Sequence, residues 1–177
     1  MRYPLKPHPH SKGQSVALLT VEAVRTKTGE LSLHYALSGD TGSLLIPPKA
    51  APARTDNLWH HTCFEVFVAS GSAPAYREFN LSPSTEWAAY QFTGYRKGMA
   101  NNENVPVPRI ECVVKPDILE LHATLVPDLA RDEPWRLAVS AVIEEKSGKK
   151  SWWALTHPQP KPDFHDPDSF TLILPSP

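Results

Sequence analysis

The chain has 177 residues, with 18 Lys and Arg against 19 Asp and Glu. This length predicts one domain over residues 1–177, large enough to bury a core without a disulfide or a structural metal. A net charge of −1 creates no field that would attract nucleic acid or an anionic membrane surface, so neither is expected as a partner. No run approaches the roughly 20 apolar residues that cross a bilayer. Residues 1–13 also lack the apolar segment of a signal peptide, so we expect a soluble, cytoplasmic protein.

Proline is unusually frequent, at 19 of 177 residues against a usual share of about 5%. Because proline lacks a backbone donor and is excluded from helix interiors, this composition predicts short strands and ordered loops. The two cysteines, Cys63 and Cys112, match no metal-ligand spacing. We expect them to be buried, reduced thiols.

Ten segments alternate with period two and are rich in Val, Leu, Thr and aromatic residues, which is typical of strands. The two-residue link Pro116-Asp117 predicts a tight hairpin, and residues 147–149 predict another turn, so the sheets should be antiparallel. The predicted strands are Val16–Thr26, Leu31–Ser38, Thr62–Ala69, Ala75–Ser82, Glu86–Phe92, Arg109–Lys115, Ile118–Leu125, Trp135–Glu145, Ser151–Leu155 and Ser169–Leu174.

Only Pro127–Asp132 is a plausible helical turn, and it is too short to cover a sheet face. The layers must therefore be sheet on sheet, which predicts an all-β, single-domain antiparallel β-sandwich of jelly-roll or immunoglobulin-like type, with a closed barrel as the variant. Three long, proline-rich loops, 45–58, 94–108 and 156–167, are of the kind that shape a ligand site at the rim of a sandwich.

Two neighbouring predicted strands carry the strongest functional signal. Alternate residues of each strand point to opposite sides, so one side of the pair is apolar and the other mixes carboxylates, an amide and aromatic rings. The first set is Phe64, Val66, Val68, Arg77, Phe79 and Leu81, and the second is Cys63, Glu65, Phe67, Tyr76, Glu78, Asn80 and Ser82.

The mixed side has two interpretations. It is either an ordinary solvated outer surface, where Glu and Asn need no role, or a concave ligand surface on which rings stack and polar groups bind hydroxyls. The chain also has five tryptophans, a rich supply for a domain of this size. Because Trp152 and Trp153 are adjacent on a strand, they must face opposite ways, and at most one can enter the same core.

Over residues 56–99 the chain resembles the bacterial DOMON-like proteins, which are related in fold to family 9 carbohydrate-binding modules. The resemblance rests on WHHTCFEVFV from Trp59, YREFNLSPSTEWAAY from Tyr76 and YRKGM from Tyr95. It implies a β-sandwich that binds sugar or haem in a pocket at one side and has no catalytic machinery. In the sugar-binding relatives, tryptophans clamp the sugar and polar side chains hold its hydroxyls; in the haem-binding relatives, Met with His or Lys ligates the iron.

Carried onto this chain, the resemblance makes Glu65 the acidic residue of its strand, and Trp59 and Trp87 candidate platforms. Trp152 or Trp153 would supply a second ring. The expected ligand is a carbohydrate or a sugar-like small molecule. The candidate ligand-binding residues are Trp59, Glu65, Glu78, Asn80, Trp87, Arg96, Trp152 and Trp153.

Haem bound without covalent attachment is the first alternative. Met99 is the one internal methionine, and His157 could supply the second axial ligand, as could His60 or His61. The simpler interpretation is that Met99 fills a gap beside its loop, so no cofactor is expected.

Other chemistries are weighed against structural roles. Histidines at 60, 61, 157 and 165 have suitable donor types for metal, but no His-x-His or His-x3-His spacing lies near them, so no metal is expected. Glu65 and Glu78 could form a glycosidase pair, although opposed surface glutamates are commoner, so we expect a non-catalytic protein. A last alternative is an interaction domain that holds a partner protein or a second copy through a sheet edge or residues 156–167.

Overall fold

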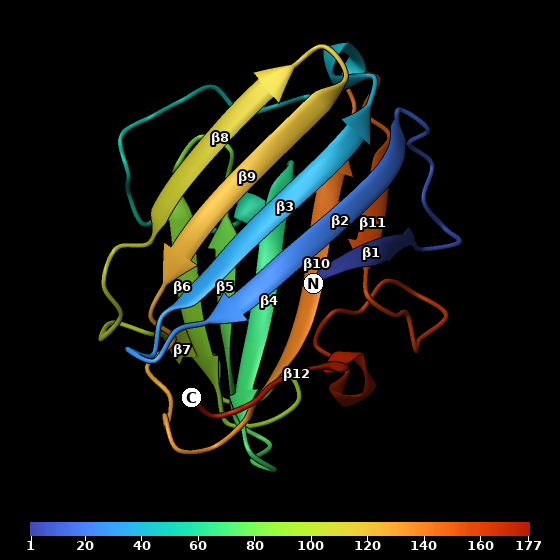
Figure 1. The fold of residues 1–177 in the computed structure, drawn as a ribbon. Coiled ribbons are helices and arrows are strands. Elements are labelled where there is room, and N and C mark those ends of the chain that lie inside the picture. The colour runs from blue at the N-terminus through green and yellow to red at the C-terminus, as the bar shows by residue number, and fades with distance from the viewer.

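The computed structural model describes residues 1–177 and is almost entirely β (Figure 1). Three 3-10 turns, Thr41–Ser43, Leu58–His60 and Pro167–Ser169, are its only helical elements, and none is long and apolar enough to cross a membrane. The strands are β1 Arg2–Pro7, β2 Val16–Arg25, β3 Leu31–Gly39, β4 Cys63–Ser70, β5 Tyr76–Leu81, β6 Trp87–Phe92, β7 Ala100–Asn101, β8 Arg109–Lys115, β9 Ile118–Leu125, β10 Trp135–Glu144, β11 Lys150–Ala154 and β12 Leu172–Leu174.

The strands form two layers that face each other, and all their pairings are antiparallel. The first layer, sheet A, has the order β2-β3-β9-β8, and in Figure 1 it crosses in front of the second layer, sheet B, ordered β7-β6-β5-β4-β10-β11. Strand β1 joins the layers, because residues 2–5 pair with β2 whereas Lys6 and Pro7 pair with β11. The predicted all-β antiparallel sandwich architecture is confirmed.

The core between the layers is built by the predicted alternation. Phe64, Val66 and Val68 of β4 and Phe79 and Leu81 of β5 all belong to one cluster of 30 buried residues that contacts both sheets. Because successive side chains of a strand point to opposite faces, Glu65 and Glu78 are turned away from this core, onto the outer face of sheet B.

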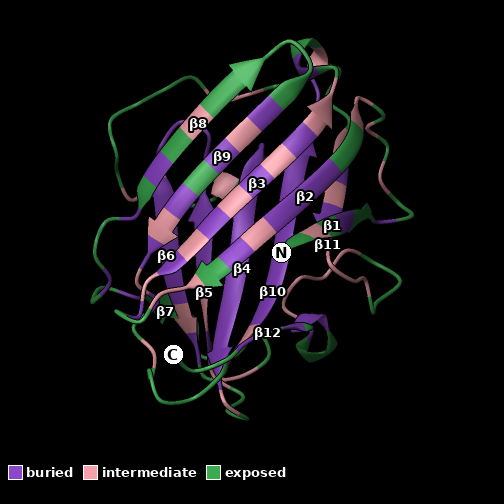
Figure 2. Cartoon of the chain, in the orientation of Figure 1, coloured by how far each residue is buried: buried purple, intermediate pink, exposed green.

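The outer face of sheet B is also covered, which the sequence did not predict. Figure 2 shows β4 buried along its whole length. A second apolar cluster lies on this face, and its members Phe67, Tyr76 and Phe92 pack against Phe170 and Phe164 from the C-terminal segment. That segment therefore serves as a partial third layer over sheet B.

Nine predicted strands are present with small shifts at their ends, and the turns at residues 116–117 and 147–149 form as expected. The predicted strand Ser169–Leu174 is shorter than expected, because Ser169 belongs to a 3-10 turn and β12 begins at Leu172. The sequence missed β1 and the two-residue β7. The helical turn predicted over Pro127–Asp132 is wrong: Asp128 has a left-handed φ of 41°. The Arg25 guanidinium binds the carbonyls of Ala130 and Arg131, so these carbonyls stabilise a loop instead of a helix.

Cys63 and Cys112 form no disulfide, as expected. Cys63 is fully buried and Cys112 is half-buried on an edge strand.

One polar contact ties the two layers together through the core. The hydroxyl of fully buried Tyr35 on β3 donates a 2.8 Å hydrogen bond to the backbone carbonyl of Glu65 on β4. The bond links sheet A to β4, the strand whose Glu65 carboxyl points to the outer face of sheet B.

We predict that Tyr35→Phe lowers the free energy of unfolding by about 1–2 kcal/mol, since the substitution removes a buried donor and keeps the ring. Urea denaturation followed by tryptophan fluorescence measures the change. Tyr3→Phe is the matched control, because Tyr3 is only partly buried and packs at the edge of the core, and its stability should equal that of the wild type. Equal stability of the two variants would contradict a role for the inter-sheet bond.

Candidate ligand-binding site

A cavity of about 380 Å³ lies on the outer face of sheet B. Strands β4, β5, β6, β10 and β11 supply its floor. Its rim comes from two of the three predicted loops, 94–108 and 156–167, and from Trp59 in the 3-10 turn Leu58–His60; loop 45–58 supplies no lining residue. Its rings are Trp59, Phe67, Tyr90, Phe92, Trp152 and Phe164. Its charged or titratable groups are Glu65, Glu78, Arg96 and His165.

Glu65 and Glu78 form the polar floor of the cavity. Phe67 is paired with Glu78 across β4 and β5, and Glu65 is paired with Asn80, so the two carboxyl-bearing residues are diagonal neighbours on one face. The predicted shared face is therefore confirmed. The side chains are deeply placed, with Glu65 3% and Glu78 5% exposed.

Each carboxyl is anchored through one oxygen only. The Ser140 hydroxyl donates to Glu65 Oε2 at 3.1 Å, and the Asn80 amide donates to Glu78 Oε1 at 2.8 Å. The second oxygen of each group, Glu65 Oε1 and Glu78 Oε2, makes no hydrogen bond within the chain; the nearest ring nitrogen to the latter, His165 Nε2, is 3.8 Å away. Two oriented oxygens thus remain available inside the cavity.

Burial shifts both carboxyls toward the neutral form. Loss of hydration raises the pKa of Glu65 to about 8, and the nearby Glu78 charge adds to this, against the lowering effect of the Ser140 bond. Loss of hydration likewise raises the pKa of Glu78 to about 7, although the Asn80 bond and Arg96 act against it. Near pH 6 both groups therefore carry a proton and can donate as well as accept.

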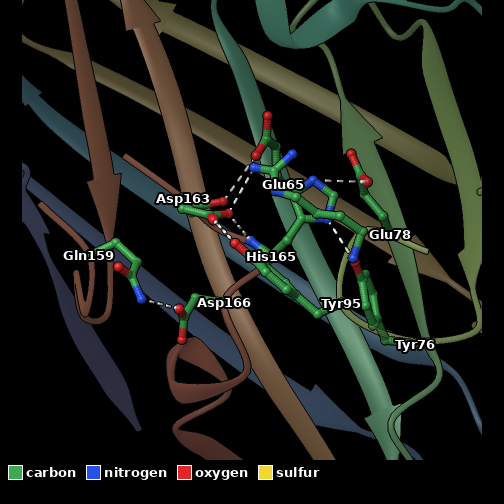
Figure 3. Close-up of polar contacts among 10 residues, drawn as sticks. Glu65, Tyr76, Glu78, Tyr95, Gln159, Asp163, His165 and Asp166 are labelled. Carbon is green, nitrogen blue, oxygen red and sulfur yellow. Dashed lines mark hydrogen bonds and ion pairs between the residues drawn. The ribbon is translucent and has the colours of Figure 1, made fainter. Parts of the chain in front are cut away.

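A hydrogen-bonded network at the rim ties two loops together, as Figure 3 shows. Asp163 accepts from the Tyr95 hydroxyl at 2.6 Å and from Arg96 Nη2 at 2.8 Å, and its Oδ1 also accepts from the backbone N–H of His165. Burial alone would raise the pKa of Asp163, but the bonds from Arg96 and Tyr95 outweigh it and hold the pKa below its usual value. Asp163 is therefore the anion that neutralises Arg96.

His165 stands in the wall of the cavity as a neutral imidazole. Burial lowers its pKa to about 4, and the positive charge of Arg96 contributes. Its Nδ1 shares a 2.8 Å hydrogen bond with the Tyr76 hydroxyl, and its ring packs edge-on against Phe67 and Phe92. The sequence did not predict a role in this cavity for Asp163 or His165, although His165 was weighed as a metal donor. The signal that pointed to them was their position in the long, proline-rich loop 156–167.

Five of the eight candidate ligand-binding residues line the cavity. These are Trp59, Glu65, Glu78, Arg96 and Trp152. Asn80 is fully buried on the same face as Glu65 and Glu78, where its amide orients Glu78.

Trp87 and Trp153 require correction as candidate platforms. Both side chains belong to the core between the layers, and neither lines the cavity. Trp87 is paired with inward-facing Leu81 and therefore shares its direction, and Arg54 lies over the Trp87 ring at 4.4 Å. The prediction that Trp152 and Trp153 face opposite ways is confirmed, with Trp152 on the cavity side.

The two residues considered as haem ligands are not brought together. Met99 lies at the cavity rim and is largely exposed. His157 does not line the cavity, and its Nε2 is 2.8 Å from the carbonyl of Lys6 on β1. The structure therefore offers no Met99–His157 axial pair across this cavity.

No protein-family model matches the chain, and no curated protein sequence matches it significantly. Solved structures do match. A candidate carbohydrate-binding protein from Bacteroides uniformis is similar at a TM-score of 0.70 and 13% identity, over 96% of this chain and 84% of that one. A family 9 carbohydrate-binding module from Caldicellulosiruptor kristjanssonii, solved with cellotriose and with glucose, gives TM-scores of 0.48 at 8% and 9% identity, over 85% of this chain and 71% and 74% of those chains. The first likeness shows that the fold is shared with a known protein.

We predict that Glu65→Gln becomes more stable relative to wild type as the pH rises from 5 to 8. In the unfolded chain the Glu65 carboxyl ionises near its ordinary value of 4.5, whereas the folded pKa is about 8. Between these values the folded state binds more protons than the unfolded state, so raising the pH costs the wild type stability. Glutamine does not titrate. The difference in unfolding free energy between Glu65→Gln and the wild type should change by at least ~1 kcal/mol between pH 5 and pH 8, since one pKa unit corresponds to about 1.4 kcal/mol.

Urea denaturation at several pH values measures this difference. Glu103→Gln, at an exposed position, should have the same pH dependence of stability as the wild type. If the unfolding free energies of Glu65→Gln and the wild type changed in parallel with pH, Glu65 would ionise normally in the folded protein.

Proposed function

We propose that this protein is a non-catalytic binding domain for an uncharged carbohydrate or a sugar-like small molecule, held in the cavity on sheet B. The observation that carries the proposal is the pair of half-anchored carboxyls. Each is oriented by one internal hydrogen bond and presents a second oxygen to the cavity. Sugar hydroxyls both donate and accept, which matches carboxyls that can do the same.

The rings of the cavity complement these polar groups. Trp59 is 46% exposed and rests on His60 at 3.7 Å between ring centroids, so its face is held in place at the rim. Trp152 contributes a second indole from β11. Apolar ring faces favour the C–H faces of a pyranose.

The size of the cavity favours a small ligand. Its volume of about 380 Å³ lies at the low end of the usual range for small-molecule sites, which is about 300–1,000 Å³. One or two sugar rings are therefore the expected occupants. The structural likeness to the candidate carbohydrate-binding protein from Bacteroides uniformis supports the same ligand class.

At pH 6 the protonation of the floor favours binding over hydrolysis. A glycosidase needs one carboxylate as nucleophile or base beside one protonated acid. With pKa values of about 8 and about 7, Glu65 and Glu78 are both mainly neutral at pH 6, and neither is a ready carboxylate.

Titration with a panel of neutral mono- and disaccharides, followed by tryptophan fluorescence and calorimetry, tests the proposal. At least one sugar should bind, and Trp152→Ala should weaken it roughly tenfold, about 1.4 kcal/mol, through loss of the stacking ring. Glu78→Gln should weaken it by a smaller factor, because the amide cannot reproduce both roles of the carboxyl.

Tyr3→Ala and Glu103→Gln are the matched controls, since neither residue lines the cavity. They should bind as the wild type does. No heat and no fluorescence change with any sugar at millimolar concentration would refute the proposal, as would binding that Trp152→Ala leaves unchanged.

A further inference from the structure

A second group of chemically active side chains lies on the opposite layer of the molecule, on the outer face of sheet A. His34 extends from β3, and Glu120 and His122 extend from β9. Figures 1 and 2 show that these two strands lie side by side and that no other element covers this face. The group therefore plays no part in the cavity on sheet B.

The three side chains converge on one point. One ligand atom from each of His34, Glu120 and His122 lies within 4.8 Å of the others. His34 Nε2 is 3.2 Å from Glu120 Oε1, and the two imidazole rings stack with centroids 4.0 Å apart and planes 13° from parallel.

Strand register holds this arrangement in place. His34 is paired directly with His122, and Ala36 with Glu120, so period two puts all three side chains on the same face. The inward neighbours of His34, Leu33 and Tyr35, are fully buried in the core. A slip of one residue would expose those apolar side chains, so the register of the cluster is strongly specified.

We propose that His34, Glu120 and His122 form a binding site for one divalent transition-metal ion of the zinc type. Zinc takes nitrogen and oxygen ligands at about 2.0–2.1 Å, so two ligands at a tetrahedral angle are about 3.3 Å apart. The 3.2 Å between His34 Nε2 and Glu120 Oε1 agrees with that spacing. The His122 ring, which is stacked on His34, would turn to bring a nitrogen to the same ion. Water would occupy the fourth position.

The charges around the cluster favour a cation. Glu22 on β2 is paired with His34, and Glu111 on β8 is paired with His122, so a carboxylate flanks each histidine along one row. Arg2 partly neutralises Glu22 through a 3.1 Å contact. The imidazole donors select zinc-like ions over Mg²⁺ and Ca²⁺, which prefer oxygen.

A second group of histidines, formed by His8, His10 and His157, has a different arrangement. His8 packs edge-on against His10 and His157, at centroid distances of 5.0 and 4.9 Å. Two of the three rings use a nitrogen within the chain: His8 Nδ1 accepts from the His10 backbone N–H, and His157 Nε2 contacts the Lys6 carbonyl. This group therefore supplies an internal control.

Isothermal titration of the full chain with Zn²⁺ tests the proposal, with Co²⁺ absorbance as a second readout of nitrogen ligation. We expect one ion per chain. His122→Gln should weaken binding at least tenfold, and His10→Gln should leave it unchanged. Glu120→Gln is the second test, in case His122→Gln lowers stability. It removes a ligand from a half-exposed position and should also weaken zinc binding.

Far-UV circular dichroism confirms that each variant folds. Absence of zinc binding by the wild type, undiminished binding by both His122→Gln and Glu120→Gln, or loss of binding in His10→Gln would each overturn the assignment. Sugar binding should be the same with and without zinc, because the two sites lie on opposite layers, so either proposal can fail without the other.

Discussion

Burial of β4 on both of its faces is the constraint on which the site depends. Its inward side chains Phe64, Val66 and Val68 pack against sheet A, which fixes Glu65 and Phe67 on the outer face. An outward face of an antiparallel sheet is normally solvated, but here the C-terminal segment covers it and removes water from Glu65. The same packing that stabilises the fold therefore produces the carboxyl with the raised pKa.

Features that depend on local alternation could be predicted from the sequence. The sides taken by Glu65 and Glu78, the opposed directions of Trp152 and Trp153 and the sandwich architecture follow from period two. The direction of Trp87 depends instead on its pairing with Leu81, which requires register across β5 and β6. Asp163 and His165 were missed because their role comes from a loop folded back over strands about 100 residues earlier in the chain, and no local pattern encodes that contact.

The same distinction explains the histidine cluster on sheet A. The spacing of Glu120 and His122 is visible in the sequence, since two residues apart on a strand means one shared face. Their proximity to His34 is not visible, because 86 residues separate His34 from Glu120 and β3 pairs with β9 rather than with its next neighbour in sequence. Ligand sets assembled across non-consecutive strands are invisible to motif spacing.

Asp163 links two segments of the chain at the rim of the cavity. Its carboxylate accepts hydrogen bonds from Tyr95 and Arg96, which both lie in the loop after β6. These bonds join that loop to the C-terminal segment, although Arg96 and Asp163 are 67 residues apart in the chain. If this join opened, water would reach Glu78, whose raised pKa comes chiefly from lost hydration, and that pKa would fall toward its ordinary value. Arg96 would also lose its counter-ion and become free to pair with the floor carboxylates. Closure of the rim thus favours neutrality of the floor, through a carboxylate that does not itself line the cavity.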